Sequence, residues 1–257
     1  MDLNCDMGEM PEQIADGTQE SLMPFLTSVN VACGGHAGDL RTMEATIRQA
    51  LRWKLAVGAH PGWPDPANFG RVPLNLAPAE IADIVFEQVR ALAEVAGKCA
   101  ARIVHVKPHG ALYNQAAGDP AIASAIAAGV ARFSRDLLLV GLAGSSMLEV
   151  FRQAGFAVAA EAFADRRYEP DGRLRSRKFS GALIHDPAEA ARQALRIAER
   201  GAAIASDGSE IAVSAQTICI HGDTTGSPAI ASAVAHAVRQ AGIGLGPPSR
   251  TSQSDMR

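Results

Sequence analysis

The chain has 257 residues, of which 47% are hydrophobic and 20% are charged, and its formal net charge is −3 at pH 7. This balance is enough for a large apolar core, and a near-neutral charge without a basic cluster excludes nucleic acid as the expected partner. No apolar run approaches the length of a membrane span, and the polar start shows no basic-then-apolar leader, so we expect a cytoplasmic protein that does not contact a membrane.

Short apolar runs alternate with longer amphipathic runs along the whole chain. The short runs predict seven strands, at residues 1–6, 28–33, 55–59, 102–106, 137–140, 157–160 and 216–220. The longer runs predict helices at residues 40–53, 78–96, 119–133, 145–153, 187–200 and 228–241. Asp39 suits the N-cap of the first helix, and Pro78 and Gly97 suit the two ends of the second.

Strand–helix alternation of this kind predicts a parallel sheet. Two α/β architectures fit it, a closed (β/α) barrel and an open doubly wound sheet. No G-x-G-x-x-G follows the first strand and no G-x-x-x-x-G-K-[ST] occurs, which disfavours the common dinucleotide and phosphate loops. Because the composition does not change along the chain, we expect one domain over residues 1–245, followed by a flexible tail over residues 246–257.

Titratable and polar side chains gather just after the predicted strands. In a parallel barrel the loops that follow the strands open on one face, where such folds carry their chemistry. Four of the histidines have a glycine close by, which allows a tight turn or the approach of the backbone to a ligand. The residues that share this position are Asp6, Glu9, His36, Asp39, His60, Asp65, Lys107, His109, Asn114, Glu161, Asp165, Arg166, Arg167, His221 and Asp223.

This mixture of side chains suits more than one kind of chemistry. Carboxylates and imidazoles form general acid–base pairs near neutral pH, and lysine and arginine bind phosphate or carboxylate. Asp6 with the histidines also suits a divalent metal. No nucleophile elbow occurs, and the four cysteines show no paired spacing, so we expect them to be reduced and buried. The residues alone indicate a hydrolase-like site for a small polar substrate, with or without a metal.

Six segments in order along the chain resemble the signatures of the LamB/YcsF family. The similarity runs from residue 2 to about residue 245, and six motifs in sequence are far more specific than any one of them. The segments are Asp2-Leu-Asn-Cys-Asp-Met-Gly-Glu9, Asn30-Val-Ala-Cys-Gly-Gly-His-Ala-Gly-Asp39, Gly58-Ala-His-Pro-Gly-Trp-Pro-Asp65, His105-Val-Lys-Pro-His-Gly-Ala-Leu-Tyr-Asn114, Glu161-Ala-Phe-Ala-Asp-Arg-Arg-Tyr168 and His221-Gly-Asp223.

The resemblance implies a single-domain, seven-stranded (β/α) barrel, similar to the barrels of polysaccharide deacetylases and some glycoside hydrolases. It also implies hydrolysis of a cyclic amide: the opening of 5-oxo-L-proline to L-glutamate, with ATP as a co-substrate that is cleaved to ADP and phosphate. Two partner chains are implied, subunits B and C of a 5-oxoprolinase. Two alternatives stay open, a metal-dependent amidase or deacetylase that acts alone and a non-catalytic subunit that binds the substrate.

Three residues are assigned to catalysis on this basis, namely Asp6, Lys107 and His109. Lys107, together with Arg166, would neutralise phosphate or the substrate carboxylate, and Asp6 or His109 would be the base for the attacking water. His105 lies earlier in its strand and is expected to support the site by packing. No residue is assigned as a metal ligand, and a divalent metal is left open. The residues assigned to substrate or phosphate binding are Asn4, Asn30, His36, His60, Arg71, Glu161, Asp165, Arg166, His221 and Asp223.

Overall fold

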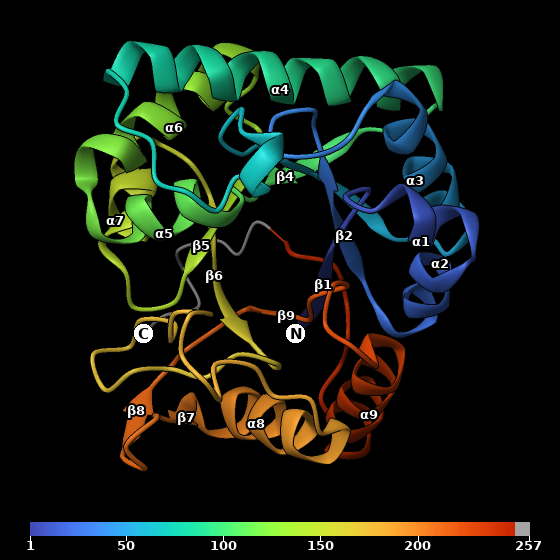
Figure 1. Ribbon diagram of the computed structural model, residues 1–257, viewed down its shortest axis with the longest axis vertical. Helices are drawn as coiled ribbons and strands as arrows, with labels where there is room; N and C mark the ends of the chain where they lie inside the picture. Colours follow the sequence, from blue (N-terminus) through green and yellow to red (C-terminus); the bar gives the residue numbers. More distant parts are fainter. Residues whose placement is uncertain (250–257) are drawn as a thin grey trace.

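The computed structural model of the protein, which describes residues 1–249, has a closed barrel of seven parallel strands at its centre (Figure 1). In order around the barrel the strands are β1 (Asp2–Met7), β2 (Ser28–Ala32), β3 (Ala56–His60), β4 (Ile103–Val106), β5 (Leu138–Leu142), β6 (Val158–Phe163) and β9 (Thr217–Cys219). Strand β9 pairs with both β1 and β6, so the barrel sheet has no open edge. The closed barrel confirms the predicted α/β class and decides against the open doubly wound sheet.

Helices cover the outside of the barrel. The helical segments are α1 (Pro11–Ala15), α2 (Thr18–Leu22), η1 (Met23–Phe25), α3 (Leu40–Arg52), η2 (Pro66–Asn68), α4 (Pro78–Lys98), α5 (Gly110–Gly118), α6 (Pro120–Phe133), α7 (Ser146–Gln153), α8 (Pro187–Arg200) and α9 (Ser227–Gln240). Figure 1 shows α4 along the upper edge, α3 at the right, α7 at the left and α8 along the lower edge. Among residues 1–249 no helix is both long and apolar enough to cross a membrane.

The strands alternate between the helices outside and the barrel interior, because successive side chains of a strand point to opposite faces. In β1, Leu3 and Cys5 join the apolar core, whereas Asp2, Asn4 and Asp6 hydrogen-bond to polar side chains of neighbouring strands. The apolar core therefore lies between strands and helices, and the barrel interior is polar.

The polar interior begins at the amino ends of the strands. Asp2 accepts hydrogen bonds there from Ser28 (2.9 Å) and Thr217 (2.6 Å). One level higher, the side-chain nitrogen of Asn30 donates to Asn4 Oδ1 (2.8 Å), and that of Asn4 donates to Thr217. These bonds link β1, β2 and β9, and they form the base on which the residues at the carboxyl ends stand.

His105 supports this interior, as expected from its place in the strand. It is buried, and its Nε2 lies 2.8 Å from Asn30 Oδ1. Gly58 on the neighbouring strand β3 provides the room, because a Cβ at that position would overlap the imidazole ring.

Local signals at helix ends are confirmed at Asp39 and at Pro78, where α4 begins, and are wrong at Gly97. Asp39 caps α3 and accepts hydrogen bonds from the main-chain nitrogens of Arg41 and Thr42. Gly97 does not end α4: the helix continues through Lys98, and Ala100 takes the left-handed conformation instead, with φ 57°. The main-chain nitrogen of residue 101 then bonds to the carbonyl of residue 96, which closes the helix with a Schellman motif.

Several elements were not predicted because they are short or weakly patterned. Helices α1 and α2 have five residues each, and α5 starts immediately after His109, in a stretch that reads as a loop. Strands β7 (Ala202–Ile204) and β8 (Glu210–Ala212) pair only with each other in an antiparallel hairpin outside the barrel. Strand β6 also runs three residues further than predicted, so Glu161 lies within the strand rather than after it.

All four cysteines are free and buried, as expected. The main-chain nitrogen of Gly246 donates to the carbonyl of Met1 (3.0 Å), so the predicted tail begins with a hydrogen bond to the other end of the chain. The rest of the expected tail, from residue 250, lies outside the described residues.

Two glycine substitutions separate packing from backbone effects. We expect Gly58→Ala to lower the free energy of unfolding by about 1–3 kcal/mol, because the new methyl group overpacks against His105. The matched control is Gly97→Ala, where nothing lies within 4 Å of the added Cβ; it should raise the free energy of unfolding by about 0.5–1 kcal/mol. Urea unfolding of wild type and the two variants measures these changes. Equal free energies of unfolding for Gly58→Ala and Gly97→Ala would contradict the assigned packing of His105.

Candidate active site

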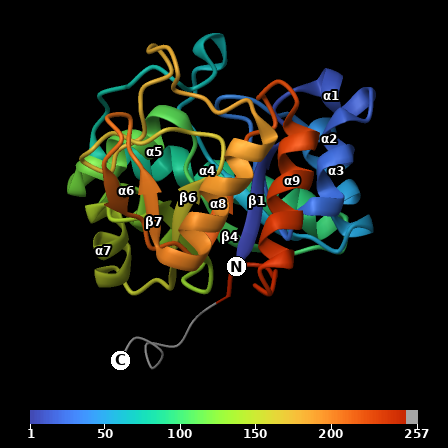
Figure 2. The ribbon, with the colours of Figure 1, turned by 90° about the horizontal axis from the view of Figure 1, so that it is seen from below.

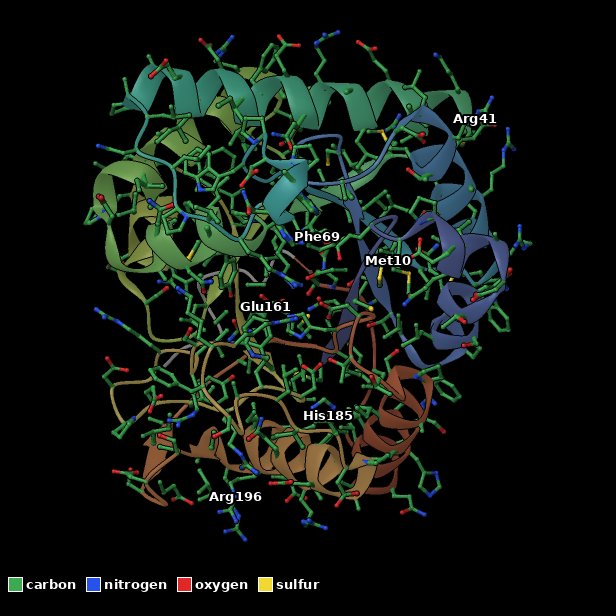
Figure 3. The ribbon with its side chains drawn as sticks, in the orientation of Figure 1. Met10, Arg41, Phe69, Glu161, His185 and Arg196 are labelled. Atoms are coloured by element: carbon green, nitrogen blue, oxygen red, sulfur yellow. The ribbon has the colours of Figure 1, made fainter. Side chains whose placement is uncertain are left out.

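A cavity of about 1250 Å³ opens at the carboxyl end of the barrel. Figure 2 shows the long connections that follow the strands gathered at the end of the barrel opposite the N-terminus. Figure 3 shows Phe69 and Glu161 near the middle of the molecule, whereas Arg41 and Arg196 lie at its outer edge. Of the residues that the sequence predicts for the site, those lining the cavity are Asp6, His60, Arg71, Lys107, His109, Arg166 and His221.

Lys107, directly after β4, is buried, and four acceptors surround its Nζ, of which Asn4 Oδ1 at 3.4 Å is the most distant. Its Nζ lies 2.9 Å from Asp6 Oδ1, 2.8 Å from Glu161 Oε1 and 3.1 Å from Cys219 Sγ. An ammonium has three hydrogens to donate, so these acceptors use all of them. Burial acts to lower the pKa of Lys107, but Asp6, Cys219 and Glu161 outweigh it and raise that pKa well above its ordinary value. Lys107 is therefore a buried cation that is already paired.

Asp6 connects Lys107 to the histidines. Its Oδ1 accepts from Lys107 and from the side-chain nitrogen of Asn30 (2.8 Å), and its Oδ2 lies 3.3 Å from His60 Nε2. Burial acts to raise the pKa of Asp6, but His60 and Lys107 outweigh it and lower that pKa well below its ordinary value. Burial likewise acts to lower the pKa of His60, and the charge of Asp6 outweighs it and raises that pKa. Asp6 is therefore ionised at neutral pH, which makes it a strong electrostatic partner and a poor proton acceptor.

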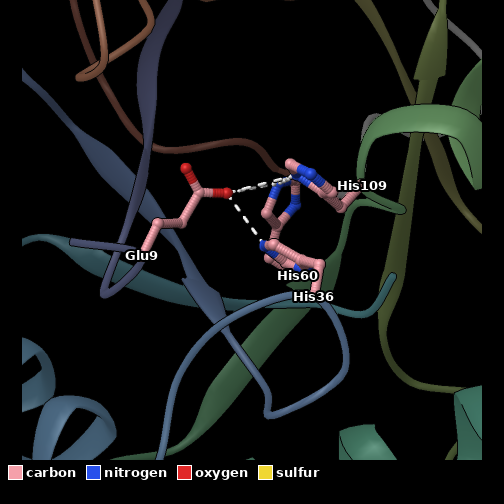
Figure 4. A group of neighbouring side chains, drawn as sticks. All are labelled: Glu9, His36, His60 and His109. Atoms are coloured by element: carbon pink, nitrogen blue, oxygen red, sulfur yellow. Dashed lines mark hydrogen bonds and ion pairs between the residues drawn. The ribbon is translucent and has the colours of Figure 1, made fainter. Parts of the chain in front are cut away.

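Three histidines and a glutamate converge beside Asp6 (Figure 4). Glu9 Oε1 lies 2.9 Å from His36 Nε2, 3.2 Å from His109 Nδ1 and 3.7 Å from His60 Nε2. His60 Nε2 and His109 Nδ1 are 2.9 Å apart. The four side chains come from the carboxyl ends of β1 to β4 or the connections after them, and each offers an atom within 4.8 Å of the others, which suits a metal ion.

Main-chain carbonyls hold two of the rings from the outside. His60 Nδ1 lies 2.8 Å from the carbonyl oxygen of Lys107, and His109 Nε2 lies 2.9 Å from that of Phe69. Phe69 has φ 54°, in the left-handed region that a non-glycine residue seldom adopts. Burial lowers the pKa of His109 and lowers that of His36 to about 4, so both rings are neutral at neutral pH.

His36 stacks on His109, with ring centroids 3.5 Å apart and planes within 4° of parallel. Two glycines make room for the stack. A Cβ on Gly62 would lie 2.6 Å from His36 Nδ1, and one on Gly70 would lie 2.7 Å from His36 Cβ. The glycines close to these histidines in the sequence therefore serve the packing of the rings.

Arginines line another part of the same cavity. Arg71 and Arg177 both pair with Asp223 Oδ2, at 2.6 and 2.7 Å. One terminal N–H group of the Arg166 guanidinium donates a hydrogen bond to the carbonyl oxygen of Arg175 (2.7 Å), but the buried Nε has no partner among the described residues. Burial, followed by the charge of Arg177, lowers the pKa of Arg166 to about 10, so it remains a cation at neutral pH. Arg166 is thus a charged group that lines the cavity, and one of its donors is buried and unpaired.

Asp165 holds His221 in place rather than lining the cavity. Its Oδ1 lies 2.9 Å from His221 Nδ1, and its Oδ2 accepts from the main-chain nitrogen of His221 (3.1 Å) and the hydroxyl of Thr224 (2.9 Å). Burial acts to raise the pKa of Asp165, but His221 outweighs it and lowers that pKa. The ionised carboxylate fixes the orientation of the His221 ring, which stacks on Phe163.

The structure separates the predicted site into residues that line the cavity and residues that support them. The predicted residues that do not line it, although each contacts one that does or continues its hydrogen-bond network, are Asn4, Asn30, His36, Glu161, Asp165 and Asp223. Glu9, Tyr113 and Arg177 also line the cavity. The sequence places Glu9 after the first strand, but it assigns none of the three a catalytic or binding role. Glu9 had a usable signal, since it stands three residues after Asp6 in the first motif; Tyr113 lies in the unpredicted helix α5.

Together the seven-stranded (β/α) barrel and its buried group of histidines and carboxylates define a barrel protein with an enzyme-like site. The chain belongs to the LamB/YcsF family, which matches residues 1–253. The resemblance seen in the sequence motifs is thereby confirmed.

Relatives with known names are similar over almost the whole chain. The A subunit of the 5-oxoprolinase from Chloroflexus aggregans is 49% identical over 243 residues, covering 95% of this chain and 96% of that protein. The A subunit of the 5-oxoprolinase from Methylococcus capsulatus is 50% identical over 231 residues, which cover 90% of this chain and 89% of that protein. The crystal structure of a lactam utilization protein from Thermus thermophilus has the same fold, with a TM-score of 0.89 at 42% identity over 96% of this chain and 99% of that one.

Removing the buried ammonium tests its pairing. We expect Lys107→Met to lower the free energy of unfolding by about 3–5 kcal/mol, because Asp6 and Glu161 are left as buried charges without a partner. The double variant Lys107→Met/Glu161→Gln should recover part of the loss, and the exposed control Lys98→Met should change little. Urea unfolding measures all three, and a double variant less stable than Lys107→Met alone would contradict the pairing.

The paired carboxylate of Asp223 predicts a pH dependence of stability. Burial acts to raise the pKa of Asp223, but the hydrogen bond from Arg177 and the nearby positive charges lower it to about 2. A lowered carboxyl pKa stabilises the folded state fully above the ordinary value of about 3.9, and this contribution is lost as the pH falls toward about 2. The free energy of unfolding of wild type minus that of Asp223→Asn should therefore shrink between about pH 6 and about pH 3. A difference that stays constant over this range would mean that the carboxylate is not stabilised by its arginines.

Proposed function

We propose that this chain is the A subunit of a 5-oxoprolinase, in which 5-oxo-L-proline binds in the cavity at the carboxyl end of the barrel. The reaction opens the cyclic amide to L-glutamate and is coupled to the hydrolysis of ATP to ADP and phosphate. The observation that carries the proposal is the similarity, over nearly the whole length of both chains, to proteins that are by name the A subunit of 5-oxoprolinase. The cavity supports it, because the cation Arg166 and a group of carboxylates and histidines line it.

The chemistry explains why such a reaction needs ATP. A five-membered lactam is a stabilised amide that water attacks poorly. Transfer of the terminal phosphoryl group of ATP to the amide oxygen makes the carbon more electrophilic, so that water adds to it. The ring C–N bond then breaks and the nitrogen leaves as the amine, and a second water hydrolyses the resulting acyl phosphate to the carboxylate and phosphate. The site then has to hold the anionic groups of the reactants, to activate the attacking water and to stabilise the charge that develops at the carbon.

The contacts described above suggest a division of these tasks. Arg166 binds the substrate carboxylate or a phosphate, because it is a cation that lines the cavity and no carboxylate in the described part of the chain pairs with it. The water is activated beside Asp6, His60 and His109. Lys107 is a positioning residue in this scheme: its three hydrogens are already donated, so it orients Asp6 rather than binding an anion.

The proposal includes two partner chains, subunits B and C, and ATP as a co-substrate. The relatives are by name one subunit of a larger enzyme, which supports an assembly with other chains. The test is the release of glutamate from 5-oxo-L-proline by the purified chain, alone and mixed with the two partners, with and without ATP. Release that requires both partners and ATP is expected.

The cluster of histidines and carboxylates favours a second candidate, a metal-dependent amidase that acts alone. It predicts chelator-sensitive glutamate release by the isolated chain without ATP, in the same assay. A subunit that binds the substrate without taking part in the chemistry would instead keep turnover in the full assembly when Asp6 or His109 is replaced.

Arg166 gives the sharpest mutational test of the anion site. We expect Arg166→Met, in the complete assembly with ATP, to lower kcat/KM by roughly 10- to 100-fold, the value of one charge-assisted hydrogen bond. Most of the loss should appear as a higher KM for 5-oxo-L-proline or ATP. Arg166→Lys keeps the charge but not the planar donor geometry, and should therefore recover only part of the lost kcat/KM. The control is Arg41→Met on the outer surface, and an unchanged KM for both substrates in a folded Arg166→Met variant would rule this role out.

A further inference from the structure

Four atoms in the cavity wall, two ring nitrogens and two carboxylate oxygens, lie close to one another, and each can accept a hydrogen bond or bind a metal ion. They are Asp6 Oδ2, Glu9 Oε1, His60 Nε2 and His109 Nδ1, and we call them the acceptor group. His60 Nε2 lies 3.3 Å from Asp6 Oδ2, 3.7 Å from Glu9 Oε1 and 2.9 Å from His109 Nδ1, and His109 Nδ1 lies 3.2 Å from Glu9 Oε1. Such short separations between lone pairs are repulsive unless a positive charge stands among them.

The main chain determines where the ring protons are. A carbonyl oxygen only accepts hydrogen bonds, so the nitrogens that contact the carbonyls of Lys107 and Phe69 must carry hydrogen. These are His60 Nδ1 and His109 Nε2. In the neutral rings the opposite nitrogens, His60 Nε2 and His109 Nδ1, are therefore lone pairs, and both point into the acceptor group. A ring held in this way by an outer carbonyl is the usual arrangement of a histidine that binds a metal.

We propose that the acceptor group binds a divalent transition-metal ion, with His60, His109, Glu9 and Asp6 as its ligands. The spacing fits: an ion with bonds of about 2.0–2.1 Å in a tetrahedron separates its ligand atoms by about 3.3 Å. The separations given above, which are four of the six among these atoms, lie between 2.9 and 3.7 Å and bracket this value. Two imidazole nitrogens with two carboxylate oxygens suit zinc, cobalt, iron or manganese better than calcium or magnesium.

His36 is excluded from the ligand set although it contacts Glu9. The lone pair of an imidazole nitrogen lies in the plane of its ring, and the rings of His36 and His109 are stacked in parallel planes 3.5 Å apart. One ion cannot lie in both planes. His36 Nε2 is instead the donor to Glu9 Oε1 at 2.9 Å, which orients that carboxylate from outside the ligand set.

The buried charges also call for a divalent cation. Asp6, Glu9 and Glu161 contribute three negative charges, Lys107 contributes one positive charge, and the sum with neutral histidines is −2. A single proton on one ring would leave −1, whereas a divalent ion brings this buried set to zero. Lys107 already occupies the space between Asp6 and Cys219, so the thiol is not part of the ligand set.

This metal site does not rest on the proposed function, because it follows from hydrogen bonds within the chain. A bound ion of this kind would polarise an amide oxygen or lower the pKa of a bound water.

The experiment measures metal binding directly. The purified full-length chain is stripped with a chelator and titrated with Zn²⁺ and with Co²⁺, whose visible absorption reports nitrogen and oxygen ligands. One ion per chain is expected. Glu9→Gln and His109→Gln should weaken binding by more than about 100-fold, and His36→Gln, which removes only an outer donor, by about 10- to 100-fold. The exposed residue His236 on α9 provides the control, and His236→Gln should bind as wild type does.

Two results would overturn the site. The first is a folded wild-type chain that takes up neither ion while NMR shows the His60 ring protonated at neutral pH, since a proton then supplies the charge. The second is stoichiometric binding that survives both Glu9→Gln and His109→Gln, which would place the ion elsewhere. A loss of metal affinity in His36→Gln as large as that in Glu9→Gln would overturn the assignment of His36 as a donor outside the ligand set. Because these readouts do not involve turnover, they stand or fall separately from the 5-oxoprolinase activity.

Discussion

The ion pairs of Lys107 hold the active end of the barrel together. An ammonium and two carboxylates that are withdrawn from water cost several kcal/mol each in lost hydration, and only close pairing offsets that cost. Lys107 follows β4, Asp6 lies on β1 and Glu161 lies on β6, so one cation joins three strands across the barrel. The interaction favours one arrangement of these strands over others, because a shift of any of them would leave a charge buried and unpaired.

The rest of the interior follows from this requirement. Asn30 keeps Asp6 in place, His105 keeps Asn30 in place, and Gly58 provides the space for His105. Polar side chains therefore fill the barrel, while the apolar core that stabilises the fold lies outside it, between strands and helices. Several of the supporting residues, namely Asn4, Asn30, His105 and Glu161, are part of the barrel wall itself.

Much of the fold is predictable from local patterns. The helix at residues 187–200 and the cap at Asp39 follow from short-range signals, and both agree with the structure. Barrel closure was not decided by those patterns, because the pairing of β9 with β6 joins strands more than 50 residues apart. Gly97 shows the limit of a local signal: the last turn of α4 closes through Ala100, and burial of the surrounding apolar residues outweighs the preference for glycine.

The members of the site were predictable, but their tasks were not. Strand ends of a parallel barrel meet at one face, so Asp6, His60 and His109 were expected together. Whether a residue lines the cavity or supports another depends on depth along the strand and on cross-strand partners. Lys107 illustrates this, because only the position of Glu161 on β6 shows that its charge is already used.

The segment between β6 and β9 stands outside the barrel wall, although it runs from residue 164 to residue 216 and includes the β7–β8 hairpin. It carries Arg166 and Arg177, which line the cavity, whereas Glu9, His36, His60 and His109 come from the first four strand ends. Arg166 and Arg177 therefore belong to a stretch of chain that takes no part in closing the barrel. A change in the length of this stretch would leave the pairing of the seven barrel strands intact, because none of its residues lies in the barrel sheet.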